Sequence, residues 1–209
     1  SDEFDGDTLK EFWTNHAPTS KAYVSDGALH IETEDGDLYQ NVKDLKNYIS
    51  QPAQGDWESV TKIQLDNMPS QIYHQIGVKI MQDEDNYLYF RLEQLDKNAG
   101  IAVRLNEEKA AKSTEIVRNT TFAGSIKGNT YYMKVMKNGQ TYNFYISADG
   151  ENYVTIKEGY TVNYSQPKYT LVAANGTGKT DIPSIKTSYD YVRFTMKEEA
   201  AAKVVKVRK

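Results

Sequence analysis

The chain has no cysteine among its 209 residues, and it has few tryptophans and prolines. The absence of cysteine excludes a disulfide scaffold and any zinc site built on thiolates. No run of about 18 apolar residues occurs, so we expect no insertion into a membrane. The net charge is -4 at pH 7 and is spread along the chain. Without a basic stripe to neutralise phosphates, we expect no nucleic-acid partner.

The sequence is instead rich in β-strand signals and in tyrosine, of which there are 16. Tyrosine suits pleated, half-exposed surfaces. About ten segments alternate between apolar and polar residues, with turn signals roughly every 8–12 residues. Trp57 to Leu65 is one, and two others flank Asn138-Gly139, a pair that favours a tight hairpin. This pattern predicts an all-β, two-sheet antiparallel sandwich that folds as one domain.

The stretch 75–95 gives the clearest indication of a binding site. It is predicted to form two strands around an acidic turn at 82–86, with Leu88, Phe90 and Leu92 on the core face, because successive strand side chains point to opposite faces. The opposite face presents rings, charges and amides, which suit a sugar. The residues predicted to bind carbohydrate are Gln75, Lys79, Tyr87, Tyr89, Arg91 and Glu93, extended from another strand by Tyr145, with Tyr142 and Asn143 as alternatives there.

Two other interpretations of this region stay open. The face is also what an ordinary exposed sheet shows, with aromatic and charged pairs across neighbouring strands. Within a sugar-binding function, the contacts could instead come from loops. In that case Trp57, Tyr73 and His74 are the candidates, although Trp57 is more typical of a core and His74 of a solvated loop.

Several pieces in order resemble a known group of domains. They are SDEFDGDTL with Phe12-Trp13 at the start, Gln51-Pro52-Ala53, DEDNY at 83–87, SADGENY at 147–153 and YDYVRF at 189–194. This set resembles the concanavalin A-like, laminin-G-type jelly rolls found beside bacterial glycoside hydrolases. It is most similar to the C-terminal accessory domain of family 43 glycosidases, over residues 1–196. We expect residues 197–209 to be a linker or the start of a following module.

The resemblance implies a two-sheet antiparallel jelly roll with one concave face and no catalysis of its own. It implies a carbohydrate-binding or accessory module of a larger extracellular or cell-surface bacterial glycoside hydrolase. The expected partners are a poly- or oligosaccharide, bound on the concave face or adjoining loops, and an adjacent catalytic domain of the same polypeptide. The opening SDEFDGD also suggests a mature or excised fragment.

A structural calcium ion is the expected cofactor. Calcium takes six to eight oxygen ligands from carboxylates and backbone carbonyls. A jelly roll brings its first and last strands together, and the resemblance adds that a calcium ion is commonly held there. The expected ligands are Asp2, Asp5 and Asp190, with Glu3 and Asp7 nearby.

Two alternative functions are weighed against glycan binding. A structural or protein-interaction module would use the polar face to pack on a neighbouring domain. A glycosidase would need a pair of carboxylates on one face, and Glu32 and Glu93 are the acids considered for that role. No nucleophile or metal motif supports an enzyme, and the fold alone does not argue for one.

Overall fold

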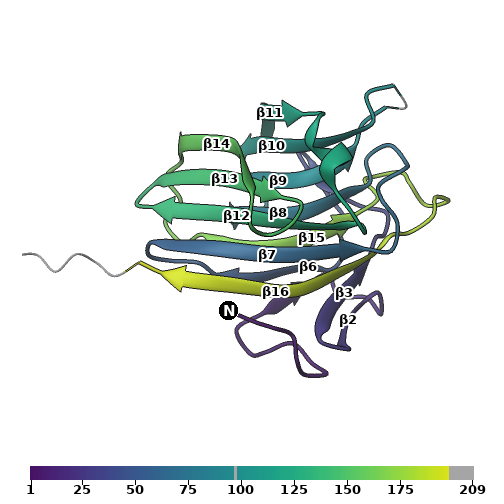
Figure 1. Cartoon of the computed structure of the whole chain (residues 1–209), viewed down its shortest axis with the longest axis horizontal. Coiled ribbons are helices and arrows are strands. Elements are labelled where there is room, and N and C mark those ends of the chain that lie inside the picture. The colour runs from purple at the N-terminus through teal and green to yellow at the C-terminus, as the bar shows by residue number, and fades with distance from the viewer. Residues whose placement is uncertain (97, 198–209) are drawn as a thin grey trace, which may run out of the picture.

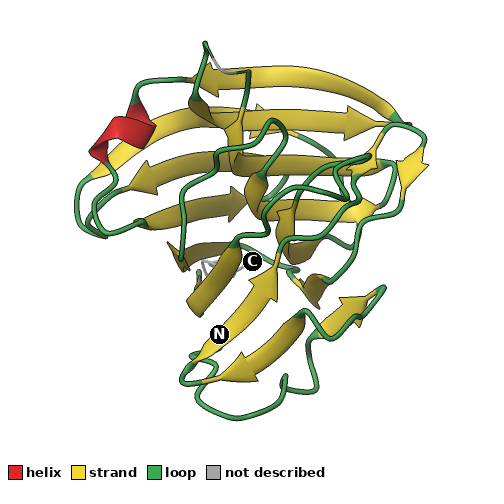
Figure 2. Ribbon diagram, turned by 90° about the vertical axis from the view of Figure 1, so that its right-hand side faces the viewer, coloured by secondary structure: helices red, strands yellow, loops and turns green. Residues whose placement is uncertain are grey.

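Two layers of strands form the molecule (Figure 1), and the computed structural model describes residues 1–96 and 98–197. Strands provide nearly all the regular structure of this part, as Figure 2 shows, together with the short 3-10 helix η1 (Phe122–Ser125). No helix in the described ranges is long and apolar enough to cross a membrane. Residues 198–209, most of the predicted linker 197–209, lie outside the described residues.

The first sheet has seven strands, and every neighbouring pair is antiparallel. In spatial order its strands are β1 (Thr14–His16), β6 (Tyr48–Pro52), β15 (Lys168–Ala174), β8 (Gln75–Asp83), β9 (Asn86–Gln94), β10 (Ile101–Lys109) and β11 (Lys112–Asn119). The hairpin β8–β9 is the predicted pair of strands around the acidic turn, and it lies near the centre of this sheet.

The second sheet also has seven strands in antiparallel pairs. In spatial order its strands are β14 (Tyr153–Thr161), β13 (Thr141–Ser147), β12 (Thr130–Asn138), β7 (Trp57–Leu65), β16 (Lys186–Met196), β3 (Ala28–Glu32) and β2 (Ala22–Ser25). The predicted concanavalin A-like sandwich is therefore confirmed.

The main core lies between the two sheets. Leu88, Phe90 and Leu92 on β9 point into it and are fully buried, as their alternation predicted. The ring of Phe90 meets the ring of Phe144 from the second sheet edge to face, with centroids 5.4 Å apart. Edge-to-face contacts between aromatic rings add stability beyond the apolar area they bury. Trp57 is fully buried in the same core and is not a loop contact.

The hairpin β12–β13 forms where it was predicted, but its loop is shifted by one residue. Asn138 pairs with Thr141 in the ladder, so the two loop residues are Gly139 and Gln140. Gly139 has φ 57°, whereas Asn138 and Gln140 have no positive φ. A glycine at the first loop position is the feature of a type II′ turn. Of the Asn-Gly pair that predicted the hairpin, only the glycine therefore adopts the positive φ that the turn requires.

A long connection crosses the outer face of the first sheet. We call residues 35–45 the flap; it contains the small hairpin of β4 (Leu38–Tyr39) and β5 (Val42–Lys43). Leu38 and Leu45 are buried against the outer face in a second apolar cluster. That cluster includes Tyr87 and Tyr89 of β9, so the flap removes from solvent part of a face that was expected to be open.

Candidate functional site

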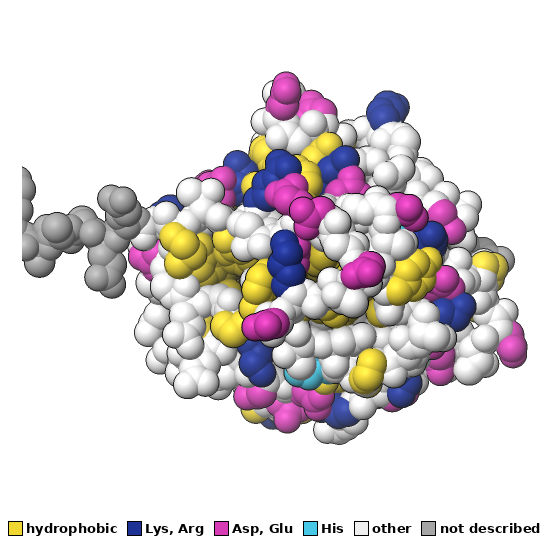
Figure 3. Space-filling model, turned by 90° about the horizontal axis from the view of Figure 1, so that it is seen from below, with side chains coloured by type: hydrophobic (Ala, Val, Ile, Leu, Met, Phe, Trp, Pro, Cys, Tyr) yellow, Lys and Arg dark blue, Asp and Glu magenta, His cyan; other side chains and the backbone are white. Residues whose placement is uncertain are grey.

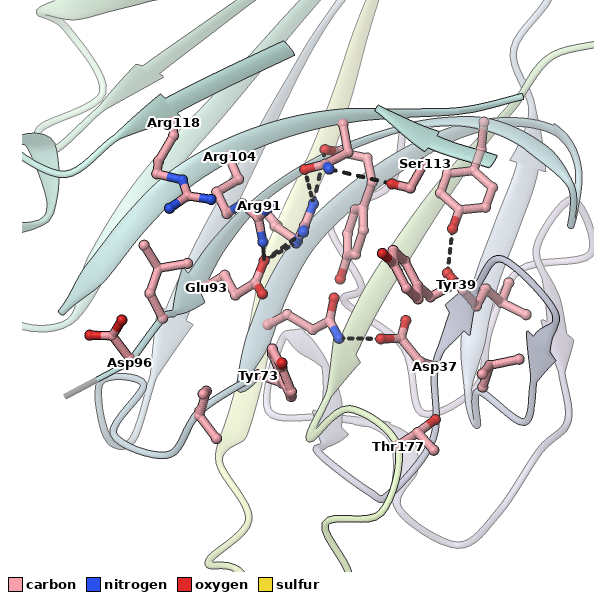
Figure 4. Close-up of a pocket in the computed structure, with 18 residues that line it drawn as sticks. Asp37, Tyr39, Tyr73, Arg91, Glu93, Asp96, Arg104, Ser113, Arg118 and Thr177 are labelled. Atoms are coloured by element: carbon pink, nitrogen blue, oxygen red, sulfur yellow. Dashed lines mark hydrogen bonds and ion pairs between the residues drawn. The ribbon is translucent and has the colours of Figure 1, made fainter. Parts of the chain in front are cut away.

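The outer face of the first sheet carries a cavity of about 500 Å³ beside the flap (Figure 4). Its floor comes from β8, β9 and β10, and its sides come from the flap and from the loop before β8. Volumes of roughly 300–1,000 Å³ are typical of small-molecule sites. The cavity is therefore large enough for a short oligosaccharide, and its position is set by how the flap crosses the sheet.

Five of the predicted sugar-binding residues line this cavity. They are Gln75, Tyr87, Tyr89, Arg91 and Glu93. Each is at most 6% exposed, so they form a recessed floor and not the open platform that the alternation suggested. The reason is the flap, which covers the part of the face where Tyr87 and Tyr89 lie.

Lys79, the sixth predicted contact on this face, lies beneath the flap and is fully buried. Its ammonium donates a hydrogen bond of 3.1 Å to the carbonyl of Leu38. It also lies 3.7 Å from the ring centroid of Tyr87 and 4.4 Å from that of Tyr89. Burial lowers the pKa of Lys79 to about 7, against the attraction of Asp37. Its observed contacts therefore hold the flap.

A row of alternating charges begins at Arg91 and Glu93 of the floor and continues along one side of the cavity, which we call its wall. Glu93 accepts ion-pair contacts through one oxygen from Arg91 at 2.5 Å and from Arg104 at 2.8 Å. Arg104 also pairs with Glu115 at 2.6 Å, and Glu115 pairs with Arg118 at 3.0 Å. Figure 4 shows the three arginines side by side along this wall. Each side chain of the row therefore has at least one ion pair, and these pairs orient the guanidinium groups.

Tyr39 and Tyr73 are the exposed aromatic residues of the cavity lining, at 47% and 48% exposure. Tyr73 has φ 75°, an unusual backbone conformation for a bulky residue. A Cβ atom on Gly176 would lie 2.7 Å from the Cβ of Tyr73, so only glycine leaves room for this side chain. Such strain is found preferentially where a side chain must be aimed at a ligand.

Tyr73 was identified from the sequence as a loop alternative, whereas Tyr39 was not considered. Tyr39 lies on the flap, and no local pattern in the sequence reports that the flap crosses this sheet. His74, expected to be solvated, is buried, and its Nε2 lies 3.0 Å from the carbonyl oxygen of Pro183. It fixes the base of the loop that carries Tyr73.

The structure places Tyr145 away from the cavity. It lies on β13 of the second sheet, where its hydroxyl donates to Glu158 at 2.7 Å. Asn143 lies on the same strand, and Tyr142 is in the core. The expectation that these residues extend the polar face was wrong, because alternation assigns a face of a strand but not the sheet to which the strand belongs.

The three carboxylates expected to bind calcium do not converge on one point: Asp2 and Asp5 both lie near the ammonium of Lys10, at 2.7 and 3.8 Å, whereas Asp190 pairs with another lysine. Asp2 is buried and accepts hydrogen bonds from the backbone of Phe4 and from Trp13, and its ion pair with Lys10 is 2.7 Å. Burial opposes ionisation, but Lys10 and these hydrogen bonds lower the pKa of Asp2. Asp5, expected beside it, has a side chain that is 78% exposed.

Asp190, expected to complete the calcium site, forms its own ion pair with Lys62 at 2.5 Å. Within residues 1–96 and 98–197, no group of three or more acidic, His or Cys side chains could hold a metal ion. Calcium needs six to eight oxygen ligands. The side chains as they lie do not fit a calcium ion, because lysine ammonium groups already compensate both Asp2 and Asp190.

The two acids considered for a glycosidase also lie apart. Glu32 belongs to β3 in the second sheet and pairs with Lys21, whereas Glu93 belongs to β9 in the first sheet. They do not form a pair of carboxylates across one cleft.

On the face shown in Figure 3, Lys and Arg side chains are interspersed with Asp and Glu, with no large basic area.

Comparisons with known proteins agree with the fold. A family model described as the β-xylosidase C-terminal concanavalin A-like domain matches residues 1–178. The GH43 protein BlXynB from Bacillus licheniformis has a solved structure similar to this chain, with a TM-score of 0.77 and 20% identity. A xylan β-1,4-xylosidase from Bacillus halodurans C-125 is similar with a TM-score of 0.74 and 16% identity.

These two alignments cover 94% and 93% of the chain, but only 39% and 38% of the solved proteins. LamAcat from Zobellia galactanivorans differs from these two proteins in how much of its own length is aligned. It is aligned over 96% of its own length and 93% of this chain, with a TM-score of 0.60 and 15% identity. Identities this low show a shared fold only. No curated protein sequence matches the chain.

Proposed function

Since the chain belongs to the family of C-terminal concanavalin A-like domains of β-xylosidases, we propose that it is a non-catalytic accessory domain that binds a glycan in the cavity beside the flap. The observation that carries this proposal is the pairing of exposed Tyr39 and Tyr73 with a recessed polar floor. A sugar has an apolar C–H face and a polar rim of hydroxyls. It can therefore place that face on a tyrosine ring while the floor takes its hydroxyls.

An unpartnered hydroxyl in the floor supports the same proposal. Tyr89 is 3% exposed, and its hydroxyl has no hydrogen-bond partner among the described residues. A buried polar group without a partner costs about 1–3 kcal/mol. A ligand hydroxyl that reached Tyr89 after a small shift of the floor would recover part of that free energy.

Calorimetric titration with xylo-, arabino- and galacto-oligosaccharides tests the proposal. We expect saturable binding, weakened between about two- and twelvefold by Tyr73→Ala, because one aromatic contact contributes about 0.5–1.5 kcal/mol. Tyr23→Ala is the matched control, because Tyr23 is also a partly exposed tyrosine (37%) but lies on the second sheet. An absence of saturable binding across the panel contradicts the proposal, and so does equal affinity of wild type and Tyr73→Ala.

We further propose that the domain acts beside a catalytic domain of the same polypeptide, outside the cell. Support comes from the solved relatives, in which the matched region is 38–39% of the chain and one protein is a xylan β-1,4-xylosidase. Tethering a weak glycan binder to an enzyme raises the local substrate concentration. An antibody against the domain should detect, in the extracellular or cell-wall fraction, a polypeptide much larger than 209 residues. A band of domain size in the lysate alone argues against this arrangement.

A further inference from the structure

The arginines of the cavity wall are already committed to carboxylates. Arg91 and Arg104 lie directly opposite each other in the ladder between β9 and β10, and Arg104 lies directly opposite Arg118 between β10 and β11. Like charges in directly opposed positions repel. Glu93 and Glu115 offset that repulsion through ion pairs of 2.5–3.0 Å with all three guanidinium groups.

The ionisable lining of the cavity is balanced in charge. It holds three arginines, the ones in the row, and three acids, Asp37, Glu93 and Asp96. Asp37 lies across the floor from the row and receives one hydrogen bond, of 2.8 Å, from the amide of Gln75 to its Oδ2. Its Oδ1 has no hydrogen-bond donor, and the carboxylate forms no ion pair, among the described residues. Gln75 lies directly opposite Glu93 in the β8–β9 ladder, so Asp37 and Glu93 lie on either side of Gln75.

Building on the glycan binding proposed above, we propose that this cavity takes an uncharged sugar and excludes acidic sugars such as uronic acids. A ligand carboxylate would have to compete with Glu93 and Glu115 for the arginines, and it would face the carboxylate of Asp37. Desolvating an anion without a free cation to pair with it is costly, and opposed like charges add to that cost.

A neutral sugar meets none of these costs. Its hydroxyls can donate to the free oxygen of Asp37 and to Oε1 of Glu93, which receives no hydrogen bond from the described residues, since both arginine contacts use Oε2. Hydrogen bonds that involve a charged acceptor are stronger than those between neutral groups. The two carboxylates on either side of Gln75 therefore favour a ligand that supplies hydroxyl donors and no negative charge.

Titration with matched ligand pairs at low salt tests this inference. The pairs are xylotetraose against xylotetraose bearing one glucuronic acid, and galactotriose against trigalacturonic acid. For whichever pair binds, we expect the neutral member to bind wild-type protein at least tenfold more tightly. Asp37→Asn should narrow that ratio at least threefold, because it removes the opposing charge at constant size. Asp26→Asn changes the net charge equally in an exposed turn of the second sheet and should leave the ratio unchanged.

The outcomes separate this inference from the proposal beneath it. If the acidic member binds as tightly as the neutral one, and Tyr73→Ala weakens both, glycan binding stands and the exclusion of acidic sugars is refuted. An unchanged ratio in Asp37→Asn refutes the role of that carboxylate. If neither pair binds and the wider oligosaccharide panel also shows no binding, the proposed function itself fails and takes the inference with it.

Discussion

Replacing Lys79 by methionine should remove a pH dependence of stability that this one buried amine imposes. Lys79 is fully buried between two tyrosine rings, and burial lowers its pKa from 10.5 to about 7. In the unfolded chain the amine keeps its proton up to about pH 10. Between the two pKa values the unfolded state therefore binds more protons, so raising the pH stabilises the folded state.

The size of the effect follows from the two pKa values of Lys79. A decrease from 10.5 to about 7 corresponds to a penalty on the order of 5 kcal/mol for the charged form, relative to the neutral form. This penalty is fully present below pH 7 and is relieved as the pH rises toward 10.5. The slope in that window approaches about 1.4 kcal/mol per pH unit. From about pH 7.5 to pH 9.5, wild type should gain roughly 2–3 kcal/mol relative to Lys79→Met.

Urea denaturation at a series of pH values measures this difference, with the free energy of unfolding extrapolated for each protein. Other titrating groups are common to both proteins and cancel in the difference. Lys127→Met, at an exposed site, is the control and should follow the wild-type curve. Parallel curves for wild type and Lys79→Met would refute the reasoning, since the amine would then keep its charge in the folded state.

Two further substitutions test local geometry. Gly176→Ala should weaken oligosaccharide binding about as much as Tyr73→Ala, because its new Cβ would displace Tyr73. Gly178→Ala is the control, because Gly178 also has a positive φ (71°, against 82° at Gly176) but has open space around it, and this variant should bind normally. Equal affinities of the Gly176→Ala and Gly178→Ala variants would contradict this. The second substitution is in the β10–β11 turn, where Ala110 and Ala111 have φ of 49° and 57°. Replacing this pair by Asn-Gly should raise the free energy of unfolding, measured by denaturant melts, by about 1–2 kcal/mol, because these residues adopt positive φ more readily than alanine. A decrease in the free energy of unfolding would show that the alanine turn is not strained.

The strands could be predicted from the sequence because their signals are local. Alternation placed Leu88, Phe90 and Leu92 in the core and put Tyr89 and Arg91 on the opposite face, and the structure agrees on both points. The period of two in a strand depends only on neighbouring residues. The family resemblance also rests on short local segments, and it predicted the same fold as the strand pattern.

The flap could not be predicted because what holds it is distant in the sequence. The carbonyl of Leu38 accepts hydrogen bonds from Lys79 and Tyr87, 41 and 49 residues away. The backbone of Gln40 is bonded to Glu108, 68 residues away. Such contacts exist only once the sheet has formed. The sequence therefore identified most of the floor of the cavity but not its cover, and it misplaced Tyr145 on the wrong sheet.

The row of alternating charges along the wall also constrains how this domain can evolve. Glu93 and Glu115 each pair with two arginines, and Arg104 is shared between them, so the loss of either acid would leave three arginines with one carboxylate and one arginine without an ion pair. A substitution that removes one acid of the row therefore destabilises the domain, and a second substitution that removes the unpaired arginine can restore the lost stability. Positions 91, 93, 104, 115 and 118 should change together among related sequences. A lineage that came to bind acidic sugars would be expected to lose Glu93 before gaining any new arginine.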